Sequence, residues 1–192
     1  MHLVFPMIKM FKNNSEKENI SWKALWTIYK WGKDPTSEIA QFLQNGGTVE
    51  QAMGMFDVAP ETETIENNLA LNEGLQELID IVCGLGSPTK WDNANARLGV
   101  GNSNTAESAT QTALQGGSKT FKTMDASYPQ RSGQTAEWRA TFGTSDANYA
   151  WEEYTVVNAS DDSGKNLNRK VSSKGTKTSG ETWTLSLQVT FS

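Results

Sequence analysis

The chain has 192 residues, of which 36% are hydrophobic and 20% are charged, and its net charge is −5. These values exclude a generally disordered chain, and the length allows a sizeable buried core. The single histidine, His2, and the single cysteine, Cys83, exclude histidine-based catalysis, histidine metal sites and an internal disulfide. We therefore expect no metal ion and no cofactor.

Charge is distributed unevenly along the chain. Residues 1–33 contain six lysines and two glutamates, whereas residues 34–89 contain ten acidic residues and no basic residue. The overall acidic balance gives no support for nucleic-acid binding. The change of sign suits head-to-tail contacts between copies or contacts with a partner, or it simply reflects solvated helix faces. No apolar stretch is long enough for a membrane span, and the chain start does not resemble a secretory signal.

A helix is predicted for the run SWKALWTIYKW near the N-terminus. Trp22, Leu25, Trp26 and Tyr29 follow the i, i+3, i+4, i+7 spacing of one helix face, and Trp31 adds a third tryptophan. A short helix cannot bury three tryptophans alone, so these side chains pack either in the chain's own core or against another subunit. The candidate assembly interface therefore comprises Trp22, Trp26, Tyr29 and Trp31.

Two further short helices are predicted between Pro35 and Pro60, separated by a Gly46-Gly47 turn. The second begins with a capping box formed by Thr48 and Gln51. The pair has the outline of a helix-turn-helix, but its second helix carries no basic residue for phosphates or base edges. We interpret it as a packing or docking element.

The run ETETIENN is interpreted as a polar linker, and a fourth helix is predicted from about Asn68 to Cys83. The apolar side of that helix is predicted to comprise Leu71, Leu75, Leu78, Ile79 and Val82. We therefore expect a helical assembly arm over residues 1–66 and a connecting helix over residues 67–89.

From Lys90 onward the pattern changes to that of strands. TAEWRATF and ETWTLSLQVTF alternate apolar and polar residues, so one face of each strand is predicted to be buried. WEEYTVV and NLNRKVS, joined by NASDDSG, predict a hairpin. Residues 90–192 are expected to form an antiparallel β-sandwich. The predicted fold class is therefore α+β, with a helical N-terminal region of about four helices followed by the sandwich.

Two patterns could carry chemistry, and both are incomplete. In RLGVGNSN, Gly99 and Gly101 end a strand, but a dinucleotide fingerprint requires a third glycine where Asn104 stands. We interpret the glycines as permitting a tight strand exit.

Glu152 and Glu153 are adjacent on a strand and point to opposite faces, so they cannot act together on one bond. We predict no catalytic residue, no cofactor-binding residue and no enzyme activity; a carboxylate-based hydrolase would need two carboxyl groups across a cleft.

Five long phrases occupy the last two thirds of the chain. They are NNLALNEGLQELIDIVCGL, WDNANARLGVGNSNTAESATQTALQGG, MDASYP, EWRATFGTSDANYAWEEYTVVNAS and LNRKVSSKGTKTSGETWTLSLQVTFS. In these phrases the chain resembles a family of bacteriophage virion proteins, described as tail or minor structural proteins. Their order is also similar, more loosely, to that of tail-collar and tail-fibre modules.

The resemblance implies a non-enzymatic structural component of the tail, collar or baseplate. Its partners would be other virion proteins and copies of itself, and its location would be the virion after assembly in the host cytoplasm. A capsid decoration or head-fibre protein is the first alternative. The second is a module that binds host-surface glycans, for which loop aromatics near Tyr128, Tyr149 or Trp151 would suit sugar stacking.

Overall fold

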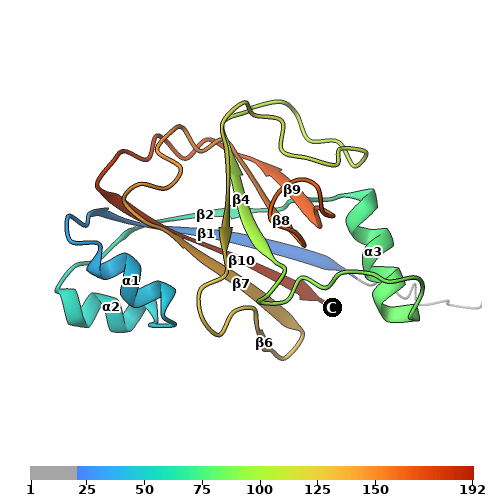
Figure 1. Ribbon diagram of the computed structural model, residues 1–192, viewed down its shortest axis with the longest axis horizontal. Coiled ribbons are helices and arrows are strands. Elements are labelled where there is room, and N and C mark those ends of the chain that lie inside the picture. The colour runs from blue at the N-terminus through green and yellow to red at the C-terminus, as the bar shows by residue number, and fades with distance from the viewer. Residues whose placement is uncertain (1–20) are drawn as a thin grey trace, which may run out of the picture.

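The computed structural model describes residues 21–192 and consists of two antiparallel β-sheets with three short helices (Figure 1). The strands of the first sheet, sheet A, are β1 (Trp22–Lys33), β2 (Glu61–Glu66), β6 (Gln130–Ser132), β7 (Thr135–Phe142) and β10 (Glu181–Phe191). The strands of the second sheet, sheet B, are β3 (Leu69–Ala70), β4 (Arg97–Gly101), β5 (Lys119–Thr123), β8 (Glu153–Val157) and β9 (Asn168–Val171). The described helices are α1 (Glu38–Gln44), α2 (Val49–Phe56) and α3 (Asn72–Cys83). The strand order is β2-β1-β10-β7-β6 in sheet A and β3-β9-β8-β4-β5 in sheet B.

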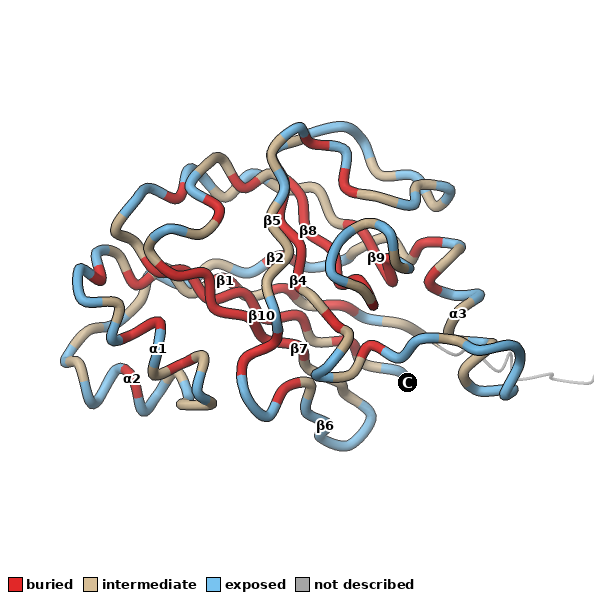
Figure 2. The backbone as a smooth tube through the Cα atoms, in the orientation of Figure 1, coloured by how far each residue is buried: buried red, intermediate tan, exposed pale blue. Residues whose placement is uncertain are grey.

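The main core lies between the two sheets, where the buried stretches of their central strands meet (Figure 2). Trp26 of β1 packs against Tyr154 of β8, with ring centroids 5.8 Å apart. Trp151 meets Phe142 and Trp183 edge to face, each at 4.9 Å between centroids. These aromatic contacts join sheet A to the segment that leads into β8, and they add to the stabilisation from burial itself.

The predicted α+β fold with about four N-terminal helices is wrong. Within residues 21–192 there are only the three short helices named above, and most of the regular structure is β. The run predicted as the first helix forms β1, which lies between β2 and β10. The run ETETIENN, interpreted as a linker, contains β2 at the edge of sheet A. Both N-terminal strands therefore belong to the sandwich.

The spacing of the apolar residues in β1 fits both the period of a helix and the period of a strand. Ala24, Trp26 and Ile28 alternate onto the inner face, whereas Leu25 and Tyr29 point to the other side. Aromatic and β-branched residues favour strands, and β10 on one side and β2 on the other provide hydrogen-bond partners for the backbone of β1. The tertiary pairing overrides the helical spacing.

Several C-terminal predictions are confirmed. TAEWRATF and ETWTLSLQVTF form the adjacent strands β7 and β10, with Leu185 opposite Ala140. Trp183, Leu185 and Leu187 face the core. WEEYTVV and NLNRKVS contribute β8 and β9, which pair as a hairpin. Because the side-chain period of a strand is two, these elements could be predicted from local sequence.

The helices α1 and α2 form a hairpin that covers part of the outer face of sheet A (Figure 1). Thr48 caps α2 through the predicted box, since its Oγ1 accepts from Gln51 N and Gln51 Oε1 accepts from Thr48 N. Trp31 packs beneath the hairpin with Ile39 and Leu43. The predicted assembly arm over residues 1–66 includes this hairpin, and its first 20 residues lie outside the described residues.

Candidate functional site

A long irregular loop lies over the outer face of sheet B, between β4 and β5. We call residues 102–118 the anchored loop. Loops longer than about 12–15 residues without secondary structure are uncommon in compact domains and are usually either functional or disordered linkers. The exposed side chains of this loop are mostly small and polar: Asn102, Asn104, Thr105, Ser108, Thr110 and Thr112.

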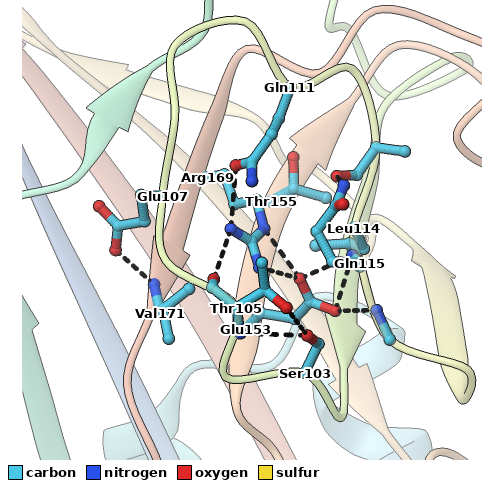
Figure 3. A network of polar contacts seen from close by, with 12 residues as sticks. Ser103, Thr105, Glu107, Gln111, Leu114, Gln115, Glu153, Thr155, Arg169 and Val171 are labelled. Carbon is cyan, nitrogen blue, oxygen red and sulfur yellow. Dashed lines mark hydrogen bonds and ion pairs between the residues drawn. The ribbon is translucent and has the colours of Figure 1, made fainter.

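A buried ion pair lies beneath the anchored loop (Figure 3). Glu153 comes from β8 and Arg169 from β9, so the hairpin pairing brings them together. Arg169 Nη2 and Nε lie 2.7 and 2.8 Å from Glu153 Oε2, and both side chains are 0% exposed. A fully buried charge pair is stabilising only when its remaining hydrogen-bonding capacity is satisfied.

The main chain of the loop supplies much of that capacity (Figure 3). Gln115 N and Gly116 N donate to the Glu153 carboxylate at 2.7–3.0 Å. Arg169 Nη1 donates to Thr105 O at 3.0 Å. Because both ends of the loop bind one ion pair, the pair fixes the path of the loop.

Gly101, the second glycine of RLGVGNSN, and Gly116 at the other end of the loop provide space for this network. β4 ends at Gly101, as predicted, and a Cβ atom there would lie 2.9 Å from Glu153 Cγ. A Cβ atom on Gly116 would lie 3.0 Å from Glu153 Oε1. The anion that these glycines accommodate is therefore a carboxylate of the protein itself.

The two adjacent glutamates have different environments, in accordance with the predicted opposite faces. Glu153 is buried, whereas Glu152 accepts a hydrogen bond from Ser173 Oγ at 2.9 Å. The oxygens of Glu153 are occupied by Arg169 and by loop amides, so its role is to position the loop. The sequence gives no local signal for the partnership with Arg169, because the two residues meet only when the hairpin forms.

A second buried ion pair anchors the α1–α2 hairpin. Arg139 Nε lies 2.8 Å from Asp125 Oδ2, and Arg139 Nη2 donates to the carbonyl oxygens of Leu43 and Gly47. Burial raises the pKa of the Asp125 carboxyl above its ordinary value, although Arg139 opposes this shift. Each sheet thus holds an irregular or helical segment on its outer face through a buried arginine.

The four residues of the candidate assembly interface do not share one surface. Trp26 is fully buried in the main core, and Trp31 is buried beneath the α1–α2 hairpin. Tyr29 is half-buried and packs against the same hairpin. Trp22 is half-buried at the start of β1, where its Nε1 donates to Asn68 Oδ1 at 3.1 Å. The strand period separates these side chains between the two faces of sheet A.

The three aromatics considered for sugar stacking lie within the packing of the fold. Trp151 is fully buried, and Tyr128 stacks with the Arg139 guanidinium, 4.3 Å from its ring centroid. Tyr149 is half-buried and donates through its hydroxyl to Val100 O at 3.0 Å. Burial raises the pKa of Tyr149 to about 12.

The helix predicted from about Asn68 to Cys83 is present as α3, but its packed side differs from the prediction. Gly74 lies against the backbone of Leu167, and Leu78 and Ile81 pack on the main core. The other side is exposed. We call the exposed apolar residues Leu75, Ile79, Val82 and Leu85 the α3 face.

Surface hollows and ion-binding groups complete this description. A polar hollow of about 390 Å³ lies over β1 and β10, beside Lys23, Glu66 and Gln188. Within residues 21–192, no three His, Cys, Asp or Glu side chains are grouped so that they could hold a metal ion. None of the described helices is long and apolar enough to cross a membrane.

Comparisons of the chain with protein-family models, with curated proteins and with solved structures found no match.

Proposed function

We propose that this chain is a non-enzymatic structural component of a bacteriophage particle, located in the tail, collar or baseplate. In this proposal it assembles through protein–protein contacts with other virion proteins and with copies of itself. The observation that carries the proposal is the anchored loop, which we assign as a contact surface.

The anchored loop has the physical properties of a preorganised contact. Its main chain is bound at Thr105, Gln115 and Gly116 by the buried Glu153–Arg169 pair. Ordering a loop on association costs free energy, and a loop that is already ordered avoids most of that cost. The loop presents uncharged hydroxyl and amide groups, which can form hydrogen bonds to a protein partner without desolvating a charge.

The sequence supports the same assignment. All of the anchored loop except Ser118 lies inside WDNANARLGVGNSNTAESATQTALQGG, the longest of the phrases through which the chain resembles virion proteins. Its two anchors, Glu153 and Arg169, lie in two other phrases, EWRATFGTSDANYAWEEYTVVNAS and LNRKVSSKGTKTSGETWTLSLQVTFS. The loop and its two anchors therefore lie within the phrases that carry the resemblance, which also include α3 and most of the strands from β4 onward.

The first experiment determines whether the chain is part of a particle, and where. Mass spectrometry of purified particles of the phage that encodes the chain is expected to detect it. A gold label attached to the chain is expected at the tail end in electron micrographs. Labels over the whole head would instead favour a capsid decoration protein, and absence from purified particles would contradict both assignments.

A second experiment tests the loop itself. We expect the double variant Asn104→Arg/Thr112→Arg to reduce incorporation into particles by about tenfold or more, since a charge at a contact centre must be desolvated. Both side chains are exposed, so the free protein should keep its stability. Ser179→Arg, at an exposed turn outside the loop, is the matched control. Equal incorporation of both variants would contradict the assignment of the loop.

A further inference from the structure

The α3 face is an apolar surface that no segment within residues 21–192 covers. Leu75, Ile79 and Val82 follow helical spacing and are 40%, 57% and 82% exposed, and Leu85 beyond the helix is 52% exposed. The opposite side of α3 already packs on the main core. A row of large apolar side chains at i, i+4 and i+7 is the pattern by which helices bind a partner segment.

We propose that the α3 face is the docking site of the chain's own N-terminal segment, residues 3–11. This segment reads LVFPMIKMF and contains seven large apolar residues that can cover the exposed row. The inference concerns the single chain and goes beyond the proposed role in a virion.

The charges of the N-terminal segment and of α3 are opposite in sign, which favours this segment as the binding partner of the α3 face. The segment carries Lys9, and Lys12 follows it directly. α3 carries Glu73, Glu77 and Asp80 and no basic residue, and of these Glu73 and Glu77 already accept hydrogen bonds from Asn166, Thr89 and Asn158. The opposite signs attract the segment to the helix and disfavour an acidic competitor.

The position of β1 makes the contact sterically possible. β1 begins, and β10 ends, at the end of the molecule where α3 lies (Figure 1). Trp22 is hydrogen-bonded to Asn68, which shortly precedes α3 in the chain. Nine residues, 12–20, span up to about 30 Å when extended, whereas the 12-residue helix is about 18 Å long. The segment can therefore reach the whole face, and covalent attachment gives it a high effective concentration there.

Cys83 provides a direct probe of this contact. It is the only cysteine, it is exposed, and it is the last residue of α3, next to Val82. Reaction of its thiol with a disulfide reagent in dilute, full-length protein reports how often the face is uncovered. We expect Phe5→Ser/Phe11→Ser to increase the reaction rate about tenfold, which corresponds to a face that is covered roughly nine-tenths of the time.

Matched variants distinguish docking from a general effect. Met55→Ser removes an apolar side chain that is 63% exposed on α2, and it should leave the rate at Cys83 unchanged. Lys9→Glu/Lys12→Glu should also increase the rate, and added salt should increase the rate of the parent protein. Circular dichroism and urea unfolding establish that each variant is folded.

A photo-crosslinker placed at residue 5 identifies the chain that provides the segment. We expect intramolecular products that join residue 5 to the peptide containing residues 72–86, with the mass of one chain. Equal thiol rates in the parent and Phe5→Ser/Phe11→Ser would overturn the proposal. Protection that disappears on dilution, with crosslinks between two chains, would overturn it in favour of exchange between copies.

Discussion

At the scale of single residues, the buried Glu153 carboxylate limits the size of the residues that can lie beside it. Gly101 and Gly116 approach it from two separate parts of the chain. A methyl group on Gly101 would enter the space of the carboxylate, and a methyl group on Gly116 would overlap Asn102 and also press on a carboxylate oxygen. The carboxylate cannot move away without losing Arg169 and the loop amides. Glycine is therefore required there for close approach of the backbone.

Gly101→Ala is expected to lower the free energy of unfolding by about 1–3 kcal/mol, because the added Cβ overlaps the Glu153 side chain. Urea unfolding followed by tryptophan fluorescence measures this change. Gly117→Ala is the matched control, since a Cβ there meets no atom within 4 Å. A similar loss of stability in both variants would contradict the proposed reason.

At the scale of elements, α3 can lie close to sheet B because Gly74, which faces Leu167, has no side chain. Leu167 Cα would lie 2.5 Å from a Cβ on Gly74, so any larger residue must push the helix away. The exposed row on the other side contributes nothing to this packing. A helix with two apolar sides does not reveal from its own sequence which side is buried.

Gly74→Ala and Gly54→Ala are expected to have opposite effects. Both glycines are inside helices, where alanine is intrinsically favoured by about 1 kcal/mol. Gly54 has open space around it, so Gly54→Ala should raise the free energy of unfolding by about 0.5–1 kcal/mol. Gly74→Ala should lower it by about 1–3 kcal/mol, because backbone atoms of Leu167 block the methyl group. Chemical denaturation of the two variants in parallel tests the difference in sign.

At the scale of the whole molecule, the two ends of the described chain are neighbours in one sheet. β1 pairs with β10 along nearly its whole length, from Trp22 opposite Phe191 to Lys30 opposite Trp183. The sheet can therefore close only after almost the entire chain is available. Pairing of such distant segments is favoured by the burial it allows and opposed by the entropy of closing the loop between them.

Deletion of residues 1–33 is expected to abolish cooperative unfolding, because it removes an inner strand of sheet A, leaves the facing edges of β2 and β10 unpaired and takes Trp26 and Ile28 out of the core. Near-ultraviolet circular dichroism during a urea titration measures the loss. A peptide of residues 21–33 should restore the transition by occupying the vacant strand position, whereas a scrambled peptide should not. A deletion variant that unfolds cooperatively without the peptide would show that β1 is dispensable.

The sequence predicts well those elements whose signals are local. The alternation in β7 and β10 and the hairpin of β8 and β9 are contained in short windows. The capping box of α2 is contained within four residues. The strand exit at Gly101 is also predicted correctly. In each case the period or the turn chemistry is sufficient, because neighbouring residues determine the conformation.

Only the tertiary structure decides the features that depend on distant partners. The run containing Trp26 fits a helix or a strand until β10 lies beside it, and the backbone pairing then selects the strand. Glu153 is a buried anchor because Arg169 and the anchored loop enclose it. The packed side of α3 is set by Gly74 against Leu167. By itself the sequence determined the strands β4, β7, β8, β9 and β10 and the short helices α1 and α2, whereas it did not predict β5 and β6. The first strand and the buried ion pairs required the contacts of the folded chain, because long-range burial outweighs local preference.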